Sequence, residues 1–435
     1  MNDQNTYQKS GPGVSIEAMK KFHQHRLLVA GSKVSQDFEQ INEYQRYVLL
    51  QISYGDQKTW CSEVKALQKT IQDEAFIRMY VDQMLMEVPW EHRHFTNIEM
   101  MLAAINYVVH TAPIYKNVSS ISWQFPLSSL MNFWMMTPSG KLLMRMPQFN
   151  NHMNQIMKAW CTYLDSPDSR VVLNEGPEGW LNPEAYKYNA LDEYMIPDRG
   201  APYWGWKSYN DFFHRQIKPE CRPVDSPDDP RIINSPNDGV AWALEHYVQR
   251  DDTFWLKTQV YSLGNILNNS HFVDQFVGGT VYQTYVNGGA DWHGFSAPIN
   301  GEVVGVELIE GYAWTESDTT PPDPMSGPYS QGWAAGVATR GLIYIDSKVK
   351  KLGTVCVIPI GLTEVSSLTT FVKPGDYVKK GDMLGWFSFG GSSFALVFQP
   401  GAIQEVLVKP PPTGRNNQPK DTLKANRRFA IANID

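Results

Sequence analysis

The sequence predicts an α+β protein in which a helical N-terminal domain is followed by a β-rich domain. Two patterns lead to this prediction. Apolar side chains recur at helical spacing from residue 15 to residue 165, whereas beyond Gly239 short apolar runs alternate with Gly, Pro and Asp turns. The chain has 435 residues. That is about two to three times the length of a typical domain, which favours at least two folding units.

The helical pattern begins with amphipathic segments whose apolar residues are three or four positions apart. One buried face is expected to consist of Val64, Leu67, Ile71, Phe76, Tyr80 and Met84. A second is expected to consist of Met153, Ile156, Trp160 and Leu164. The methionines of this region are expected to fill the core rather than to bind a ligand: Met84, Met86, Met100, Met101, Met131, Met135 and Met136.

A proline-rich segment, Ser166–Pro236, separates the two patterns and is expected to consist mainly of loops. One helix is predicted within it, from Tyr209 to Gln216, and Ser208 is a suitable N-cap for that helix.

The β-rich pattern contains short apolar runs at 301–308, 341–345 and 354–358. The segment 372–385 has two turn glycines, Gly375 and Gly381, each followed by Asp. These features predict a compact barrel-sandwich built from short hairpins. The basic, proline-rich stretch Lys409–Arg428 is expected to be a solvated tail.

Composition excludes several classes of protein. The 38 Lys and Arg are outnumbered by 45 Asp and Glu, which gives a net charge of −7. The chain therefore lacks the basic clustering typical of nucleic-acid binding and of attraction to anionic lipids. The apolar run Phe125–Met136 is too short to span a membrane and is interrupted by Pro126. We expect neither a nucleic-acid partner nor a membrane partner.

The termini and cysteines suggest the compartment. Residues Met1–Gly13 lack the apolar region of a secretory signal, and we expect residues 1–14 to be disordered. The four cysteines form no CxxC pair, so neither a zinc cluster nor a disulfide framework is predicted. They are Cys61, Cys161, Cys221 and Cys356. A reducing, cytoplasmic location is expected.

The segment Phe387–Phe398 places two glycines and two serines between strand-like runs. One interpretation is a simple hairpin turn, in which glycine supplies the backbone conformation and serine a local hydrogen bond. The other is an exposed Gly391–Ser392 peptide, where the serine hydroxyl attacks its own preceding carbonyl. The pattern alone leaves both open.

Several blocks in fixed order make the chain similar to the phosphatidylserine decarboxylase family, and within it to the soluble fungal branch that includes tryptophan decarboxylase. The blocks are Gly179–Asn182, Ala201–Arg215, Lys218–Pro223, Ser235–Gly239, Tyr261–Leu263, His293 with Ala297–Pro298, and Gly381–Asp382 through Gly390–Ser393. The resemblance implies a helical domain at 15–178 and a catalytic domain at 179–435.

The resemblance also implies a chemistry. Such enzymes cut themselves at the bond corresponding to Gly391–Ser392, and Ser392 becomes an N-terminal pyruvoyl group. The fragments 1–391 and 392–435 would remain associated. The pyruvoyl ketone would form a Schiff base with a substrate amine and accept the electrons released with CO₂, without pyridoxal phosphate and without a metal.

Two further site residues follow from the resemblance. Asp238 corresponds to the aspartate of the self-processing triad and would orient an imidazole, although an Asp-Gly turn explains it equally well. His293 would be the general acid that protonates the substrate after decarboxylation, because imidazole titrates near neutral pH. Outside the resemblance, a His in a Gly-rich loop is usually a surface residue.

The chain departs from the family at one position. Ser296 stands where the family has the histidine that activates the serine, and a hydroxyl cannot accept a proton as imidazole can. Three accounts are open: His293 serves both steps, a distant histidine such as His246 or His271 replaces the base, or the chain is an unprocessed, inactive member.

The leading hypothesis is a pyruvoyl-dependent decarboxylase of a free L-amino acid of aromatic, tryptophan-like type, which releases CO₂ and the amine. The alternative enzyme is a phosphatidylserine decarboxylase that makes phosphatidylethanolamine. A carrier module of the biotinyl or lipoyl type is also considered, because 372–385 resembles its hairpins. No suitably placed lysine at a tight turn follows Gly341, which disfavours this last class.

Overall fold

The computed structural model describes residues 38–52, 57–116, 123–251, 255–256, 259–260, 262–286, 291–315, 331–361, 363–364, 367–389, 392–410 and 422–434. For 255–256, 259–260 and 392 it describes the backbone alone. The expected disorder of residues 1–14, the helical pattern of 15–37 and Gly391 lie outside the described residues.

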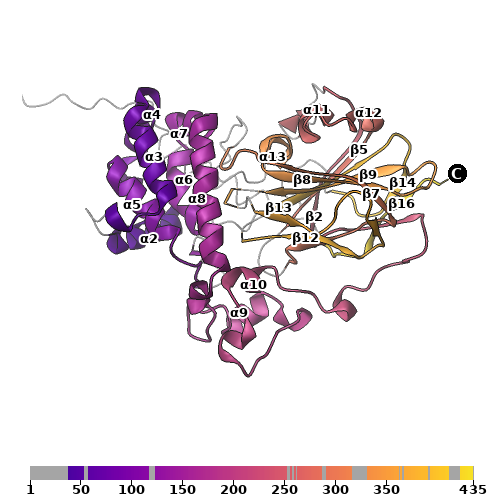
Figure 1. The fold of residues 1–435 in the computed structure, drawn as a ribbon, viewed down its shortest axis with the longest axis horizontal. Helices are drawn as coiled ribbons and strands as arrows, with labels where there is room; N and C mark the ends of the chain where they lie inside the picture. The colour runs from indigo at the N-terminus through magenta and orange to yellow at the C-terminus, as the bar shows by residue number, and fades with distance from the viewer. Residues whose placement is uncertain are drawn as a thin grey trace, which may run out of the picture.

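The N-terminal part is helical, as predicted. Its α-helices are α2 (Phe38–Gln51), α3 (Ser62–Asp73), α4 (Ala75–Glu87), α5 (Ile98–Val108), α6 (Pro126–Met135), α7 (Pro138–Met144) and α8 (Pro147–Asp165). Figure 1 shows them as one block beside the ends of the β-strands. Their shared core includes the predicted face of α3 and all four predicted residues of α8.

The predicted face does not continue through α4. Phe76 is 71% exposed, and the buried residues of that helix are Ile77, Val81, Met84 and Leu85. The reason is a break in the helix: Glu74 has extended backbone angles, so α4 starts a new helical phase. Met86, expected in the core, is 60% exposed because it lies on the opposite face from Met84.

The proline-rich segment contains two short α-helices, where one was predicted. Ser208 caps α10 (Tyr209–Phe213) by accepting the N–H of Asp211, which confirms the N-cap, although the helix ends before Gln216. The helix that sequence reasoning missed is α9 (Pro183–Tyr188), capped by Asn182 with Pro183 in its first turn. The core shared with the helical block extends through this segment to Phe213.

The C-terminal part is β-rich. Its strands are β1 (Ile232–Asn234), β2 (Gly239–Val248), β3 (Trp255–Leu256), β4 (Gln259–Val260), β5 (Gly279–Tyr285), β6 (Gly294–Ser296), β7 (Gly301–Ile309), β8 (Arg340–Asp346), β9 (Thr354–Gly361), β10 (Leu368–Thr370), β11 (Tyr377–Val378), β12 (Met383–Phe387), β13 (Ser392–Phe398), β14 (Ile403–Val406), β15 (Thr422–Leu423) and β16 (Arg428–Ala432). Three short helices accompany them: α11 (Leu263–Ile266), α12 (Val273–Phe276) and α13 (Gln331–Val337).

The main sheet has eight antiparallel strands in the order β11-β7-β8-β9-β13-β5-β2-β15. Two three-stranded sheets, β10-β12-β6 and β1-β16-β14, accompany it. Alternate residues of β9 enter two different cores, so both faces of the sheet are covered. The predicted turn glycines Gly375 and Gly381 have φ of 95° and 84°, which glycine adopts without strain.

The C-terminal stretch is not simply a solvated tail. Residues 422–423 form β15 against β2, and Leu423 and Ala425 are buried. These residues pack against the β-rich part because their apolar side chains enter the cores and their backbone extends the main sheet.

Candidate active site

The site is built around the first residue of β13. Ser392 pairs with Gly361 at the end of β9, and the next residue, Ser393, pairs with Tyr285 of β5. Tyr285 pairs in turn with Val240, two positions after Asp238. The sheet register therefore brings the predicted residues 238 and 392 to the same end of the sheet. Gly390, Gly391 and the side chain of Ser392 lie outside the described residues.

Asp238 is fully buried and ionised. Arg222 donates two hydrogen bonds to its carboxylate, from Nε at 3.0 Å and from Nη2 at 2.7 Å. The N–H of Ala425 donates a third at 2.7 Å. Burial alone would raise the pKa of this carboxyl, but Arg222 and Lys424 outweigh burial and lower it. The partners of Asp238 are thus cations and backbone N–H groups, and none of its described hydrogen bonds goes to an imidazole.

Two of these cations were not singled out from the sequence. Arg222 also contacts Glu193 at 2.7 Å, and its pKa is raised because bonds to the two carboxylates outweigh the cost of burial. Lys424 approaches Asp238 at 3.3 Å and Asp291 at 3.5 Å. The sequence did offer a clue to Arg222, because this residue lies in the family-like block Lys218–Pro223. None existed for Lys424, since a basic stretch is normally solvated.

His293 is buried at the start of β6. Its carbonyl accepts the N–H of Phe387, and its ring centroid lies 4.0 Å from that of Phe213. Burial, helped by the charge of Arg215, lowers the pKa of His293 to about 3, although Asp238 acts in the opposite direction. The ring is therefore neutral at pH 7, contrary to the expectation that it titrates near neutrality. Its Nδ1 has no hydrogen-bond partner within the described part of the chain.

Ser296 is engaged in structure rather than poised as a base. Its hydroxyl donates to Asn426 Oδ1 at 2.8 Å, and its N–H donates to the carbonyl of Pro236. The Asn426 amide donates in turn to the carbonyl of Arg222 at 3.0 Å. Ser296 therefore ties β6 to the C-terminal segment and to the Arg222 loop.

The two distant histidines do not reach this end of the sheet. His246 pairs with Thr280, which pairs with Phe398 at the far end of β13. At about 3.3 Å per residue, that end is roughly 20 Å from Ser392. His271 precedes α12, which leads into β5 at the same far end. His214 lies nearer, with its ring stacked on that of Trp386, and a positive charge on it would lower the pKa of His293.

The helical block closes the site through Phe389. This ring packs against Trp160 of α8 at 5.0 Å, Tyr209 at 5.4 Å and Phe213 at 5.2 Å. The N–H of Phe389 donates to the side chain of Asn210 at 3.1 Å. Phe389, just before the predicted cleavage position, is thus in contact with helices α8 and α10.

A buried carboxyl, Glu364, also lies at this contact and was not predicted. It accepts the backbone N–H of Ser128 at the start of α6. Burial raises its pKa to about 8, and the hydrogen bonds from Ser128 only partly offset that rise. No sequence motif marked this residue.

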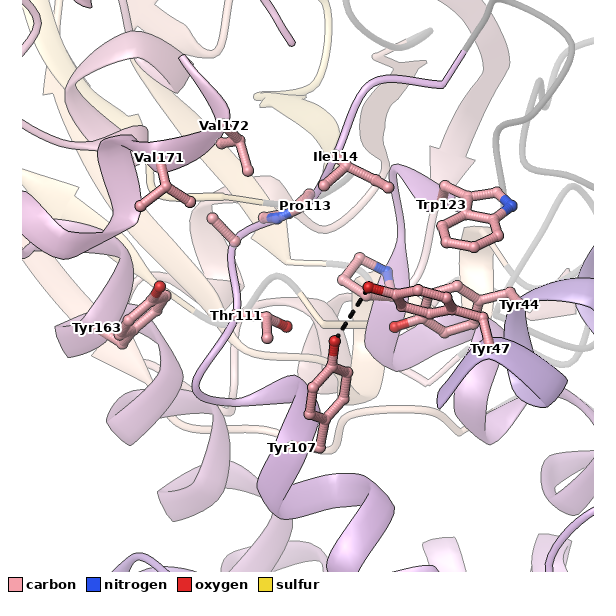
Figure 2. A pocket seen from close by; sticks show the side chains of 12 residues that line it. Tyr44, Tyr47, Tyr107, Thr111, Pro113, Ile114, Trp123, Tyr163, Val171 and Val172 are labelled. Atoms are coloured by element: carbon pink, nitrogen blue, oxygen red, sulfur yellow. Dashed lines mark hydrogen bonds between the residues drawn. The ribbon is translucent and has the colours of Figure 1, made fainter. Parts of the chain in front are cut away.

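A small cavity of about 180 Å³ lies in the helical part. Figure 2 shows the hydroxyls of Tyr47 and Tyr107 bonded to each other at its edge, with Trp123 and Tyr163 among its walls. One wall residue, Thr111, accepts through its carbonyl the indole N–H of Trp160 at 2.8 Å. Trp160 therefore contacts both a residue of the cavity wall and Phe389.

Among the described residues, no cluster of three or more His, Cys, Asp or Glu side chains could hold a metal ion. Within the same residues, no helix is both long enough and apolar enough to cross a membrane.

Comparison with known proteins identifies the family. A model described as phosphatidylserine decarboxylase matches residues 209–415, and a second model with the same description matches residues 62–188. The decarboxylase iboD of Amanita muscaria is 36% identical over 296 residues, which cover 64% of this chain and 84% of that protein. The chain belongs to the phosphatidylserine decarboxylase family. It is accordingly a decarboxylase, a carboxy-lyase.

Two other relatives match this chain over a smaller share of their own length than iboD does. The L-tryptophan decarboxylase of Psilocybe cubensis is 30% identical over 338 residues, or 72% of this chain and 75% of that protein. The phosphatidylserine decarboxylase proenzyme 3 of Schizosaccharomyces pombe is 34% identical over 200 residues, or 46% of this chain and 19% of that protein. The Amanita and Psilocybe enzymes thus align over a larger share of this chain than the Schizosaccharomyces phosphatidylserine decarboxylase does.

Proposed function

We propose that the chain cuts itself between Gly391 and Ser392 and decarboxylates a free aromatic L-amino acid with the pyruvoyl group so formed. The observation that carries this proposal is the convergence of Ser392, Asp238 and His293 at one end of the sheet. The family assignment supplies the reaction type. The substrate and the cofactor are the proposed part.

The fold accommodates a cut before β13. This strand lies between β9 and β5 in the middle of the main sheet, while β14 and β16 join β1, and β15 joins β2. The fragment 392–435 would therefore remain interleaved with the fragment 1–391, because leaving would break four sets of strand pairs. We propose that the two fragments stay associated in this way.

The side chains around the start of β13 suit a pyruvoyl group. When present, its ketone would accept the electrons released with CO₂. Asp238 stays ionised because Arg222 and Lys424 neutralise it, so it holds the C-terminal segment and the Trp292 backbone in place. Neutral His293 is buried beside Phe213.

His293 is proposed to deliver the proton that replaces CO₂ at the substrate α-carbon. A nearby anion stabilises the protonated form of an imidazole. A substrate carboxylate that enters beside His293 would therefore raise its pKa and let it take up a proton. His293 would then become protonated only when substrate is bound. This limits proton transfer from His293 in the absence of substrate.

The name of the Psilocybe cubensis relative and the cavity support an aromatic amino acid. An apolar cavity of about 150 Å³ can hold a benzene ring, and the cavity beside Trp160 is of similar size at about 180 Å³. We propose that aromatic rings around Phe389 and this cavity provide the apolar surroundings for the substrate side chain.

The test is expression of the full chain, a denaturing gel and the intact mass of each fragment. We expect fragments 1–391 and 392–435, the second with a hydrazine-reactive ketone at its N-terminus, and neither in Ser392→Ala. A single uncut chain would contradict the proposal and favour an inactive family member. CO₂ release from aromatic L-amino acids, compared with phosphatidylserine in vesicles, tests the substrate: release from the lipid alone would favour the alternative enzyme.

A further inference from the structure

One side of helix α4 presents an apolar stripe that the described elements leave exposed. Its four large side chains are spaced three, seven and four residues apart, so they share one face. These residues, called the α4 stripe below, are Phe76, Met79, Met86 and Trp90, with exposed fractions of 71%, 41%, 60% and 81%. The first three lie on α4, and Trp90 follows in the 3₁₀ turn Trp90–His92. A contiguous apolar surface of this kind marks a site where another element or molecule packs.

The charges around the α4 stripe limit what fits it. Residues 69–91 contain five acidic and two basic residues, which gives a net charge of −3. One of the two cations, Lys69, is already paired with Asp73 at 2.6 Å, while Asp82 is exposed on α4. A second copy of this acidic surface would bring like charges together, whereas a basic amphipathic helix would complement them. The α4 stripe therefore favours a basic, amphipathic partner.

A segment of the same chain has this character. Residues 16–30 are flanked by Ser15, a suitable N-cap, and by Gly31, a suitable helix stop. The segment holds three basic residues and one acidic residue, a net charge of +2. In a helix, its apolar residues on one side would be Ile16, Met19, Phe22, Leu27 and Ala30. Residues 16–30 lie outside the described residues, so these features are predictions from the sequence.

The chain enters the described structure beside one end of the α4 stripe. The ring of Phe38, the first residue of α2, lies 5.7 Å from that of His92, two positions after Trp90. The connecting residues 31–37 can span at most about 25 Å. A helix over 16–30 would be about 22 Å long, and the part of the stripe on α4 covers about 15 Å. The segment is therefore long enough to lie along the stripe, with its last residue at the Trp90 end.

We propose that the α4 stripe is the docking surface of residues 16–30, which pack on it as an amphipathic helix parallel to α4. In this arrangement Met19 lies near Met79, and the basic residues of the segment face the acidic surroundings of Asp82. Figure 1 shows α4 on the side of the helical block away from the β-strands, so the docked segment completes that block without contacting the candidate active site. Because the partner belongs to the same chain, its effective concentration is about millimolar, and a modest contact keeps it bound.

The first test is amide hydrogen exchange in the full chain. We expect residues 16–30 to exchange at least about tenfold more slowly than residues 1–12, because a helix of this length is marginal in water unless it is docked. Met86→Glu places a charge in the proposed contact and should abolish this protection. Leu308→Glu on β7 should leave it unchanged, and the control is matched because Leu308 is 59% exposed and Met86 60%. Equal exchange in the two wild-type segments, or full protection in Met86→Glu, would overturn the proposal.

A cross-linking test identifies what occupies the α4 stripe. Met19→Cys combined with Met79→Cys should form a disulfide within one chain under mild oxidation, detected as a bridged peptide by mass spectrometry. Met19→Cys combined with Leu308→Cys should give no such peptide. A bridge that joins two chains on a non-reducing gel would assign the stripe to a second copy and refute docking of the chain's own segment. The lack of any bridge between positions 19 and 79 would refute it as well.

Discussion

The Nζ of Lys424 lies 3.3 Å from Oδ2 of Asp238, although the two residues are 186 positions apart. Asp238 is fully buried and bound more tightly by Arg222, so Lys424 is the outer of two cations on one carboxylate. This relationship connects the last strands of the chain to the centre of the site.

The two cations are expected to differ in their contribution to stability. Arg222→Met leaves a buried carboxylate without its main partner and should lower the free energy of unfolding by about 3–5 kcal/mol. Lys424→Met removes a partly exposed charge and should lower it by about 1 kcal/mol or less. Urea unfolding measures both, with Lys348→Met at an exposed surface pair as the control. Equal losses at the two positions would contradict this ranking.

Ser296→Ala should affect structure and not self-cleavage. The substitution leaves the half-buried Oδ1 of Asn426 without its donor, which costs about 1 kcal/mol. The hydroxyl is not a base, so the fraction of cut chain on a gel should match that of wild type once the protein is folded. Loss of cutting at unchanged stability would instead give Ser296 a direct role.

His293→Gln should impair decarboxylation of the substrate without preventing self-cleavage of the chain. Gln keeps a polar side chain in the buried position, but it cannot deliver a proton to the substrate. We expect kcat for CO₂ release to fall by about 10²–10⁴-fold, while the chain still cuts, because the buried His293 has a pKa of about 3 and is too weak a base for the cleavage step. CO₂ release and gel analysis on the same sample provide the comparison. An uncut His293→Gln chain of normal stability would favour a single histidine for both steps.

Glu364 should make stability depend on pH. Its pKa is raised from 4.5 to about 8 by burial, so the folded state holds the proton more tightly than the unfolded state. The stability this provides is complete below pH 4.5 and is lost as the pH rises through 8, by about 5 kcal/mol in total. Tyr44 and Tyr209, which face the carboxyl, stay neutral throughout.

The measurement is the free energy of unfolding at several pH values between 5 and 9. Glu364→Gln replaces the acid with a group that does not titrate, so the difference between wild type and variant should change steadily across this range. His293 contributes equally to both proteins and cancels in the difference. Parallel profiles would mean that the carboxyl is ionised in the folded protein at neutral pH.

Local patterns predicted much of the fold. The change from helical to strand spacing, the Ser208 cap and the glycines at 375 and 381 depend on a few neighbouring residues, and each agrees with the structure. The misplaced face of α4 also has a local cause, but the break at Glu74 has no marker such as Gly or Pro. The capped helix α9 was readable from Asn182–Pro183 and was overlooked.

The site was predictable only in part. Blocks of the sequence pointed to Asp238 and His293, whereas the contacts that determine their charges come from distant segments. Spacing along the chain could not place Lys424 against Asp238, nor indicate that burial holds His293 neutral. Glu364 was undetectable for the same reason, since its character comes from the α6 start packed against it.

The central position of β13 has a consequence for the lifetime of the enzyme under the proposed chemistry. A catalytic ketone at the head of a strand inside the sheet is made once per molecule and cannot be exchanged for a fresh one. A side reaction that transfers the substrate amino group to this ketone would inactivate that enzyme molecule permanently. The supply of working enzyme would then depend on new synthesis rather than on the availability of a dissociable coenzyme.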